Sequence, residues 1–144
     1  MVEADAGMPD TICLNDTTQL MASGGTAYEW FPTISLDDAF ISNPMAFPNS
    51  TRTYLVTVTD GNNCSSLDSV EIVVNPLPTA DAGLDTAICI GGTASLTATG
   101  GTGYVWSTGA NTASTNVSPV VTTMYYVTVT DGNGCTNTDS VQVP

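Results

Sequence analysis

The sequence contains no histidine and no lysine, and Arg52 is its only basic residue. A serine or cysteine nucleophile therefore has no histidine to activate it, and a lysine nucleophile is excluded. The lysine–asparagine isopeptide bond that cross-links some β-sandwich domains is excluded as well. Asp37 and Asp38 are the only adjacent acidic pair, and we expect them to lie in a solvated loop, because a glycosidase needs two carboxylates converging in a cleft. The chain is predicted not to be an enzyme.

The shortage of positive charge also restricts the partners of the chain. Fourteen acidic residues give a net charge of −13, which argues against nucleic acid, since phosphate binding needs lysine or arginine. No apolar run approaches the roughly 20 residues of a membrane span, so no direct membrane insertion is expected. The acidic start, Met1–Asp5, lacks the apolar core of a signal peptide. We therefore expect a fragment of a longer chain, whose neighbouring domains are its partners.

What the sequence does contain is an internal repeat that covers nearly its whole length. The second half of the sequence matches the first. The offset between matching residues is constant up to Trp106 and slightly shorter beyond it. The second repeat has therefore lost residues between its Trp and its Tyr. The matching segments are Ala4–Gly7 with Ala80–Gly83, Ile12-Cys13 with Ile88-Cys89, Gly24–Trp30 with Gly100–Trp106, Tyr54–Gly61 with Tyr125–Gly132, and Asp68–Val70 with Asp139–Val141.

Each repeat has the pattern of a β-sandwich. Val56 and Val58 alternate with threonine, the period expected of half-buried strands. Asp60–Asn63 and Asp131–Gly134 are hairpin-turn sequences. The sequence therefore predicts an all-β chain of two tandem Ig-like or PKD-like sandwiches arranged end to end, at residues 1–75 and 80–144, with a proline-rich linker at 76–79.

Each repeat also carries two cysteines at equivalent positions. A domain of about 70 residues is marginally stable alone, and a disulfide closing a loop of about 50 residues contributes roughly 4 kcal/mol in the chain-entropy model. Four cysteines allow three pairings. We expect the pairs within each repeat, Cys13–Cys64 and Cys89–Cys135, and an extracellular, oxidising location. A redox or metal-binding role is the alternative, although there is no CxxC motif.

The remaining candidate residues belong to two groups. The expected core anchors are Trp30, Trp106, Tyr54, Tyr125, Leu20 and Leu96, with the two tyrosines anchoring their strand as in a tyrosine corner. The alternative for the two tryptophans is that they are exposed and stack on sugars. The candidate calcium ligands are Asp5, Asp10, Asp60, Asp81, Asp85 and Asp131, of which Asp81, Asp85 and Asp131 are expected to converge near the joint between the repeats. The alternative is that these carboxylates are turn residues or are solvated.

The motif Ala-x-Ala-Gly…Ile-Cys…Gly-Gly-Thr-x-Tyr-x-Trp…Tyr-x-Val-Thr-Val-Thr-Asp…Cys…Asp-Ser-Val occurs in both halves. It resembles the PKD-like/Ig-like repeats of large, secreted, gliding-motility-associated and adhesin-type bacterial cell-surface proteins. The resemblance implies a structural spacer or stalk that presents a binding region lying elsewhere in the parent protein. The alternatives are a carbohydrate-binding accessory module of a secreted polysaccharide-degrading protein, with extracellular or cell-surface glycans as partners, and a calcium-dependent adhesion module. No other cofactor is expected.

Overall fold

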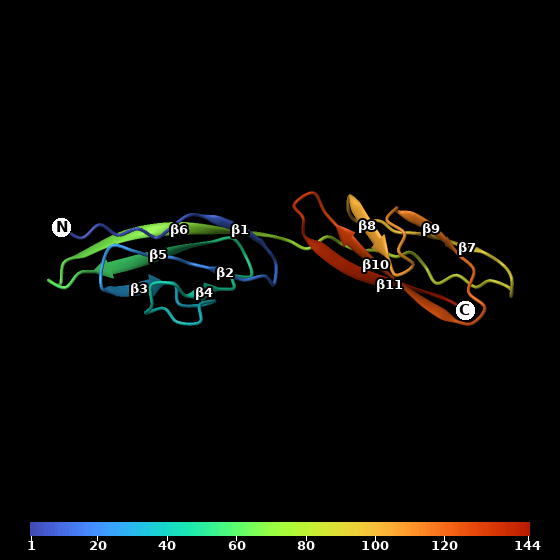
Figure 1. The fold of residues 1–144 in the computed structure, drawn as a ribbon, viewed down its shortest axis with the longest axis horizontal. Coiled ribbons are helices and arrows are strands. Elements are labelled where there is room, and N and C mark those ends of the chain that lie inside the picture. Colours follow the sequence, from blue (N-terminus) through green and yellow to red (C-terminus); the bar gives the residue numbers. More distant parts are fainter. The chain divides into compact units, whose positions relative to one another are not determined.

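The computed structural model describes residues 1–144, and every regular element in it is a β-strand (Figure 1). The prediction of an all-β fold is confirmed. The chain divides into two compact units, Met1–Pro76 and Leu77–Pro144, so the division falls inside the predicted linker. No helix in the structure is long and apolar enough to cross a lipid bilayer.

The first unit contains six strands. They are β1 (Asp10–Cys13), β2 (Thr18–Gln19), β3 (Ala27–Phe31), β4 (Met45–Ala46), β5 (Arg52–Thr59) and β6 (Ser65–Asn75). The larger sheet has the order β1-β6-β5-β3, and β2 pairs with β4 in the opposite layer. Strand β1 runs parallel to β6, whereas β5 pairs with β6 and with β3 in antiparallel fashion.

The second unit repeats this plan with one strand fewer. Its strands are β7 (Ala94–Thr97), β8 (Gly103–Trp106), β9 (Ser114–Val117), β10 (Thr123–Thr130) and β11 (Thr136–Val143). Three of them form a sheet of order β11-β10-β8, and β7 pairs with β9 in the facing layer. No strand corresponds to β1 of the first unit.

A separate hydrophobic core fills each sandwich, because alternate residues of the central strands point inward. Tyr54, Val56 and Val58 on β5 are fully buried, as are Val127 and Val129 on β10. Leu20 and Leu96 enter from the facing layers and are 3% and 2% exposed. Burial of side chains from both layers of one unit is what makes each repeat a folding unit of its own.

One tryptophan lies at the centre of each core. Trp30 and Trp106 are 0% and 2% exposed. Each indole N–H still finds an acceptor, since Trp30 Nε1 donates to the Ile41 carbonyl and Trp106 Nε1 donates to the Thr112 carbonyl, both at 3.0 Å. The polar end of the ring is thereby satisfied, which burial of a tryptophan requires.

In each unit the chain enters at one end of the sandwich and leaves at the other. We call these the leading end and the trailing end. The chain enters each unit beside the turn between the last two strands. In the first unit, a Cβ on Gly24 would lie 1.9 Å from the Glu3 carbonyl oxygen. In the second, a Cβ on Gly100 would lie 1.8 Å from the Thr79 carbonyl oxygen. Only glycine permits this close backbone approach, which explains the repeated Gly-Gly pair. The last strand then carries the chain to the trailing end.

Candidate functional site

The two cysteines of the first unit lie at opposite ends of its sandwich. Cys13 is the last residue of β1 and is in register with Asn75, at the trailing end. Cys64 immediately precedes Ser65, the first residue of β6, at the leading end. The 11 residues of β6 separate these ends by about 33 Å. A disulfide needs Cα atoms within about 7 Å of each other, so these two cysteines cannot pair.

The second unit has the same arrangement. Cys135 immediately precedes Thr136, the first residue of β11. Cys89 follows a segment that lies against the far end of this strand, because the Thr86 N–H donates to the Gln142 carbonyl at 3.2 Å. The two cysteines are therefore separated by about 20 Å or more of strand β11.

The oxidation states agree with this geometry and correct the predicted pairing. Cys13 and Cys135 are disulfide-bonded, whereas Cys64 and Cys89 are free and exposed. The prediction of Cys13–Cys64 and Cys89–Cys135 bridges is wrong, because each proposed pair has one free member and lies at opposite ends of a strand. The predicted pairs occupy equivalent positions in the two repeats, but a long strand separates the two members of each pair.

Two carboxylates that the sequence analysis did not single out as site residues hold the incoming chain to the last strand of each unit. Asp68 on β6 accepts the Ala6 N–H at 2.8 Å, and Asp139 on β11 accepts the Ala82 N–H at the same distance. The bond to the Ala6 N–H, followed by one from the Ser69 N–H, lowers the pKa of the Asp68 carboxyl. The pKa of Asp139 is lowered by the equivalent bonds. The repeated Asp-Ser-Val triplet was the available signal for this contact.

The six candidate calcium ligands are placed separately along their units. No group of three or more acidic or cysteine side chains is arranged to hold a metal ion. Asp85 accepts the Gln142 N–H at 2.8 Å near the trailing end, whereas Asp131 accepts the Asn133 and Cys135 N–H groups at 2.8 and 2.9 Å in the leading-end turn. The predicted convergence of Asp85 and Asp131 is therefore wrong, because β11 separates them.

The other four of these carboxylates also bind groups close to them in the chain. Asp60 caps its turn as Asp131 does, accepting the Asn62 N–H at 2.8 Å and the Cys64 N–H at 3.0 Å. Asp5 and Asp81 accept the N–H of Gly7 and Gly83, each at 2.8 Å. Asp10 accepts the Thr18 hydroxyl. These side chains order turns and loop connections, the usual role of aspartate at such positions.

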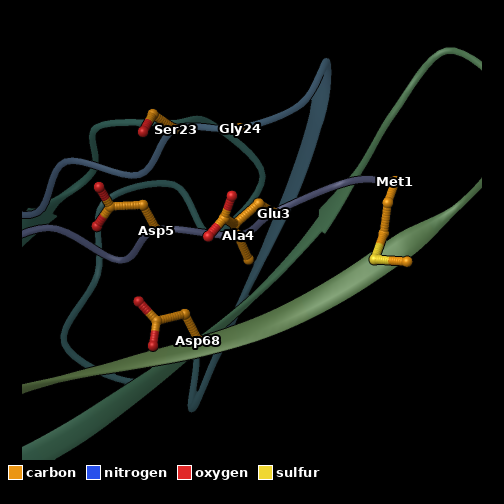
Figure 2. A pocket seen from close by; sticks show the side chains of 7 residues that line it. All are labelled: Met1, Glu3, Ala4, Asp5, Ser23, Gly24 and Asp68. Atoms are coloured by element: carbon orange, nitrogen blue, oxygen red, sulfur yellow. The ribbon is translucent and has the colours of Figure 1, made fainter.

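The leading end of the first unit is hollowed. The hollow has a volume of about 550 Å³, and Figure 2 shows the carboxylates of Glu3, Asp5 and Asp68 around it. Its lining residues are Met1, Glu3, Ala4, Asp5, Ser23, Gly24 and Asp68. Two of the three carboxylates are engaged by backbone N–H groups, Asp5 by Gly7 and Asp68 by Ala6. This end of the repeat therefore offers an open acidic surface and no enclosed cavity.

The tyrosines differ from the prediction of a tyrosine corner. The Tyr54 hydroxyl is buried without a hydrogen-bond partner, and burial raises the pKa of Tyr54, partly opposed by the charge of Arg52. Tyr125 is only partly buried against the second core. The hydroxyls that do tie a strand to a preceding loop are those of Tyr28 and Tyr104, which donate to the Gly25 and Gly101 carbonyls at 2.8 and 2.7 Å.

The exposed aromatic side chains of the first unit were also missed. Phe31, Phe40 and Phe47 are 70%, 68% and 48% exposed. All three belong to the segment between Trp30 and β5, which is the segment shortened in the second repeat. Their position in this longer connection was the available signal.

Comparison with known proteins relates the chain to other sandwiches by structure alone, since no family model and no curated protein matches it. The structure of the insect immune protein hemolin superposes with a TM-score of 0.51 at 15% identity, covering 96% of this chain and 45% of hemolin. The fold is immunoglobulin-like. The Ig1+Ig2 structure of DIP-gamma aligns at 11% identity over 98% of this chain and 96% of its own, with a TM-score of 0.43.

Fibronectin(III)-like modules are also among the structural neighbours of the chain. Those of Clostridium thermocellum CbhA align at 13% identity over 99% of this chain and 93% of theirs, with a TM-score of 0.42.

Proposed function

We propose that this chain is a two-repeat spacer of a secreted or cell-surface protein. The observation that carries the proposal is the position of the chain ends in each Ig-like unit. The chain enters each sandwich at its leading end and leaves from its trailing end. Repeats with this geometry extend a chain with every copy added, whereas repeats whose two ends lie together do not.

The interior of each repeat supports a mechanical role. Each core consists largely of apolar side chains around one tryptophan, and the first also encloses the Tyr54 hydroxyl. Two prolines, Pro76 and Pro78, lie in the segment that links the units in sequence, and proline restricts the backbone wherever it occurs. In this proposal the repeats hold other domains of the parent protein apart.

The cysteines support an extracellular location. Disulfides persist in oxidising compartments and are rare in the cytosol, and Cys13 and Cys135 are disulfide-bonded. The resemblance of the sequence to PKD-like/Ig-like repeats of large bacterial surface proteins supports an adhesin-type parent protein. In this proposal the binding region lies in other domains of that parent.

Force spectroscopy tests the spacer role directly. The reduced chain, held at its two termini, is expected to unfold in two separate steps, each releasing about 20 nm of chain. Two steps of similar length are the signature of two independent modules in series. A single step, or smooth extension without a step, would overturn the proposal that each repeat bears load as a unit.

A carbohydrate-binding module is the second candidate, and the exposed phenylalanines favour it. Trp30 and Trp106 are buried and cannot stack on a sugar, but Phe31, Phe40 and Phe47 are accessible in the first repeat. A Phe31→Ala/Phe47→Ala variant is expected to lose any glycan binding that the native chain shows on a polysaccharide panel. The matched control is Tyr126→Ala, which removes an exposed aromatic of the second repeat (54% exposed). Equal loss in both variants would exclude a specific site on the first repeat.

A further inference from the structure

The turn between the last two strands has the same construction in both repeats and differs in its fourth residue. It is formed by Asp60–Asn63 in the first repeat and by Asp131–Gly134 in the second. The carboxylate of the first aspartate accepts the N–H groups two and four residues ahead, at 2.8 to 3.0 Å. The N–H groups of Asn63 and Gly134 donate to the carbonyl of the same aspartate at 3.1 and 3.2 Å. The backbone hydrogen bonds of the two turns are therefore equivalent.

The turn of the second repeat contains Asn133-Gly134, the only Asn-Gly pair in the sequence. Both residues are exposed, and a Cβ placed on Gly134 would meet no atom within 4 Å. The Asn133 backbone N–H is bound by the Asp131 carboxylate at 2.8 Å, but no protein group binds the Asn133 side-chain amide. This side chain is therefore free to turn toward the backbone nitrogen that follows it.

The glycine after Asn133 decides whether that approach is possible. Asparagine is among the chemically labile residues of proteins, because its side-chain amide carbon can close a five-membered ring with the next backbone nitrogen. A Cβ on the next residue crowds this ring closure, and glycine has none. In the first repeat the next residue is Asn63, which carries a Cβ and has a φ of 62°, against 83° for Gly134. Similar backbones thus present an obstructed nitrogen in one repeat and an open nitrogen in the other.

We propose that Asn133 is a site of spontaneous modification in the folded chain, where it converts to aspartate and isoaspartate, whereas Asn62 in the equivalent turn does not. The reaction needs no enzyme or cofactor, because the attacking nitrogen and the attacked carbon belong to adjacent residues. Water is the only other reactant. The inference goes beyond the spacer function and does not depend on it.

The conversion takes place in two steps. The Gly134 nitrogen bonds to Asn133 Cγ as the bond from Cγ to Nδ2 breaks, and the Gly134 N–H proton passes through solvent to the leaving nitrogen, which departs as ammonia. Water then opens the resulting five-membered imide at either of its carbonyls. Opening at Cγ gives aspartate, and opening at the main-chain carbonyl of residue 133 gives isoaspartate. Overall one water enters and one ammonia leaves, with no oxidation or reduction.

The Gly134 N–H has to leave its hydrogen bond before its nitrogen can react. This bond to the Asp131 carbonyl is 3.2 Å long, at the upper end of the usual range. Open space surrounds the turn, since a Cβ on Gly132 would also meet no atom within 4 Å. Exposed turns of this kind open locally at a small fraction of the free energy of global unfolding. The reaction therefore requires the turn to open, while the rest of the repeat stays folded.

Either product changes the turn in which it forms. The new carboxylate lies two residues from Asp131, whose Oδ1 accepts the Asn133 and Cys135 N–H groups at 2.8 and 2.9 Å, so it adds like charge to an acidic turn. In isoaspartate the main chain passes through the former side chain and gains one carbon, which displaces the following N–H groups from Asp131. Loss of about one such hydrogen bond should lower the melting temperature of the second repeat by about 4–8 °C.

Timed peptide mapping of the full chain tests the inference. The protein is incubated at mildly alkaline pH and physiological temperature, sampled at intervals and digested in acid. Mass spectrometry then follows the replacement of the side-chain NH₂ group by OH at each asparagine. Asn133 is expected to convert at least about tenfold faster than Asn62. Both isomers are expected, and electron-transfer fragmentation distinguishes them; aspartate without isoaspartate would overturn the route through the imide.

Two reciprocal variants serve as matched controls. Gly134→Asn gives the second turn the sequence of the first and should slow the conversion of Asn133 at least about tenfold, whereas Asn63→Gly should raise the rate at Asn62 to that of Asn133. Melting temperatures of the fresh variants check that both repeats stay folded. Equal rates at Asn62 and Asn133 in the native chain, or conversion of Asn133 in denaturant only, would overturn the proposal. Because the spacer test uses freshly prepared protein, its two unfolding steps would stand whichever result is obtained here.

Discussion

The two repeats share one sequence motif, yet only the first completes the edge of its larger sheet. In the first unit, β1 pairs in parallel with β6 from Asp10 to Cys13. In the second, the corresponding segment makes one backbone hydrogen bond to the last strand, from Thr86 to Gln142, and forms no strand. The two repeats therefore differ at this edge, although both carry the Ile-Cys motif there.

The connection between Trp and Tyr is the second difference. In the first repeat this connection contains β4 and three exposed phenylalanines. The shorter connection of the second repeat contains β9. Both versions leave the tryptophan buried, with its indole N–H bonded to a carbonyl of this connection. The core therefore tolerates a change of length here, and the loop surface is free to vary.

The largest effect is expected from the core position that both repeats share. Trp30→Ala and Trp106→Ala should each lower the free energy of unfolding of the affected repeat by about 3–5 kcal/mol, because a buried aromatic leaves a cavity. Denaturant unfolding followed by the fluorescence of the remaining tryptophan would report the intact repeat separately. Loss of both repeats in either variant would contradict the independence of the two cores.

The Gly-Gly pair should be equally sensitive in both repeats. Gly24→Ala and Gly100→Ala place a Cβ within 1.9 and 1.8 Å of a carbonyl oxygen, at φ values of 108° and 109°. Each should cost about 2 kcal/mol or more, since both the contact and the backbone are strained. Gly61→Ala is the matched control, because a Cβ there meets no atom within 4 Å. If Gly61→Ala lowers the melting temperature as much as Gly24→Ala and Gly100→Ala do, the close approach is refuted.

The unequal edges predict unequal effects at one equivalent position. Ile12 on β1 is buried, whereas Ile88 is only partly buried. Ile12→Ala should destabilise the first repeat by about 2–4 kcal/mol, and Ile88→Ala should cost less than about 1 kcal/mol. Equal losses, measured by chemical denaturation, would show that the second repeat also packs this segment.

Acid should weaken the two repeats alike, through Asp68 and Asp139. Backbone N–H donors lower the pKa of both carboxyls in the folded state. A lowered folded-state pKa contributes stability that is complete above the unfolded value of about 3.9 and is lost as the pH falls through the folded value. Asp68→Asn and Asp139→Asn should each flatten the fall in melting temperature below about pH 4. If the melting temperature of the variants falls at low pH as steeply as that of the native chain, these carboxylates have no such role.

Calcium is expected to have the smallest effect. The six candidate carboxylates accept backbone or hydroxyl hydrogen bonds and do not converge. The melting temperature should therefore be the same in calcium as in chelator, for both repeats. A clear rise in calcium would show that ligands from a further domain complete a site and would favour the calcium-dependent adhesion alternative.

The sequence by itself determined the repeated motif, the β character of the chain and the apolar residues of each core. These depend on local properties: the period-two alternation around Val56 and Val127, the Asp-Gly turns, and the apolar residues at equivalent positions. The inward positions of Leu20 and Leu96 follow from the same alternation.

Only the tertiary structure decided which cysteines can meet, which aspartates lie together, and which tyrosine hydroxyls bind. Cys13 and Cys64 look like a pair in sequence, but the 11 residues of β6 hold them apart. Asp85 and Asp131 are separated by β11 in the same way. Such contacts depend on the direction and length of the strands that separate two residues, which are properties of the folded sheet and have no local signature in the chain.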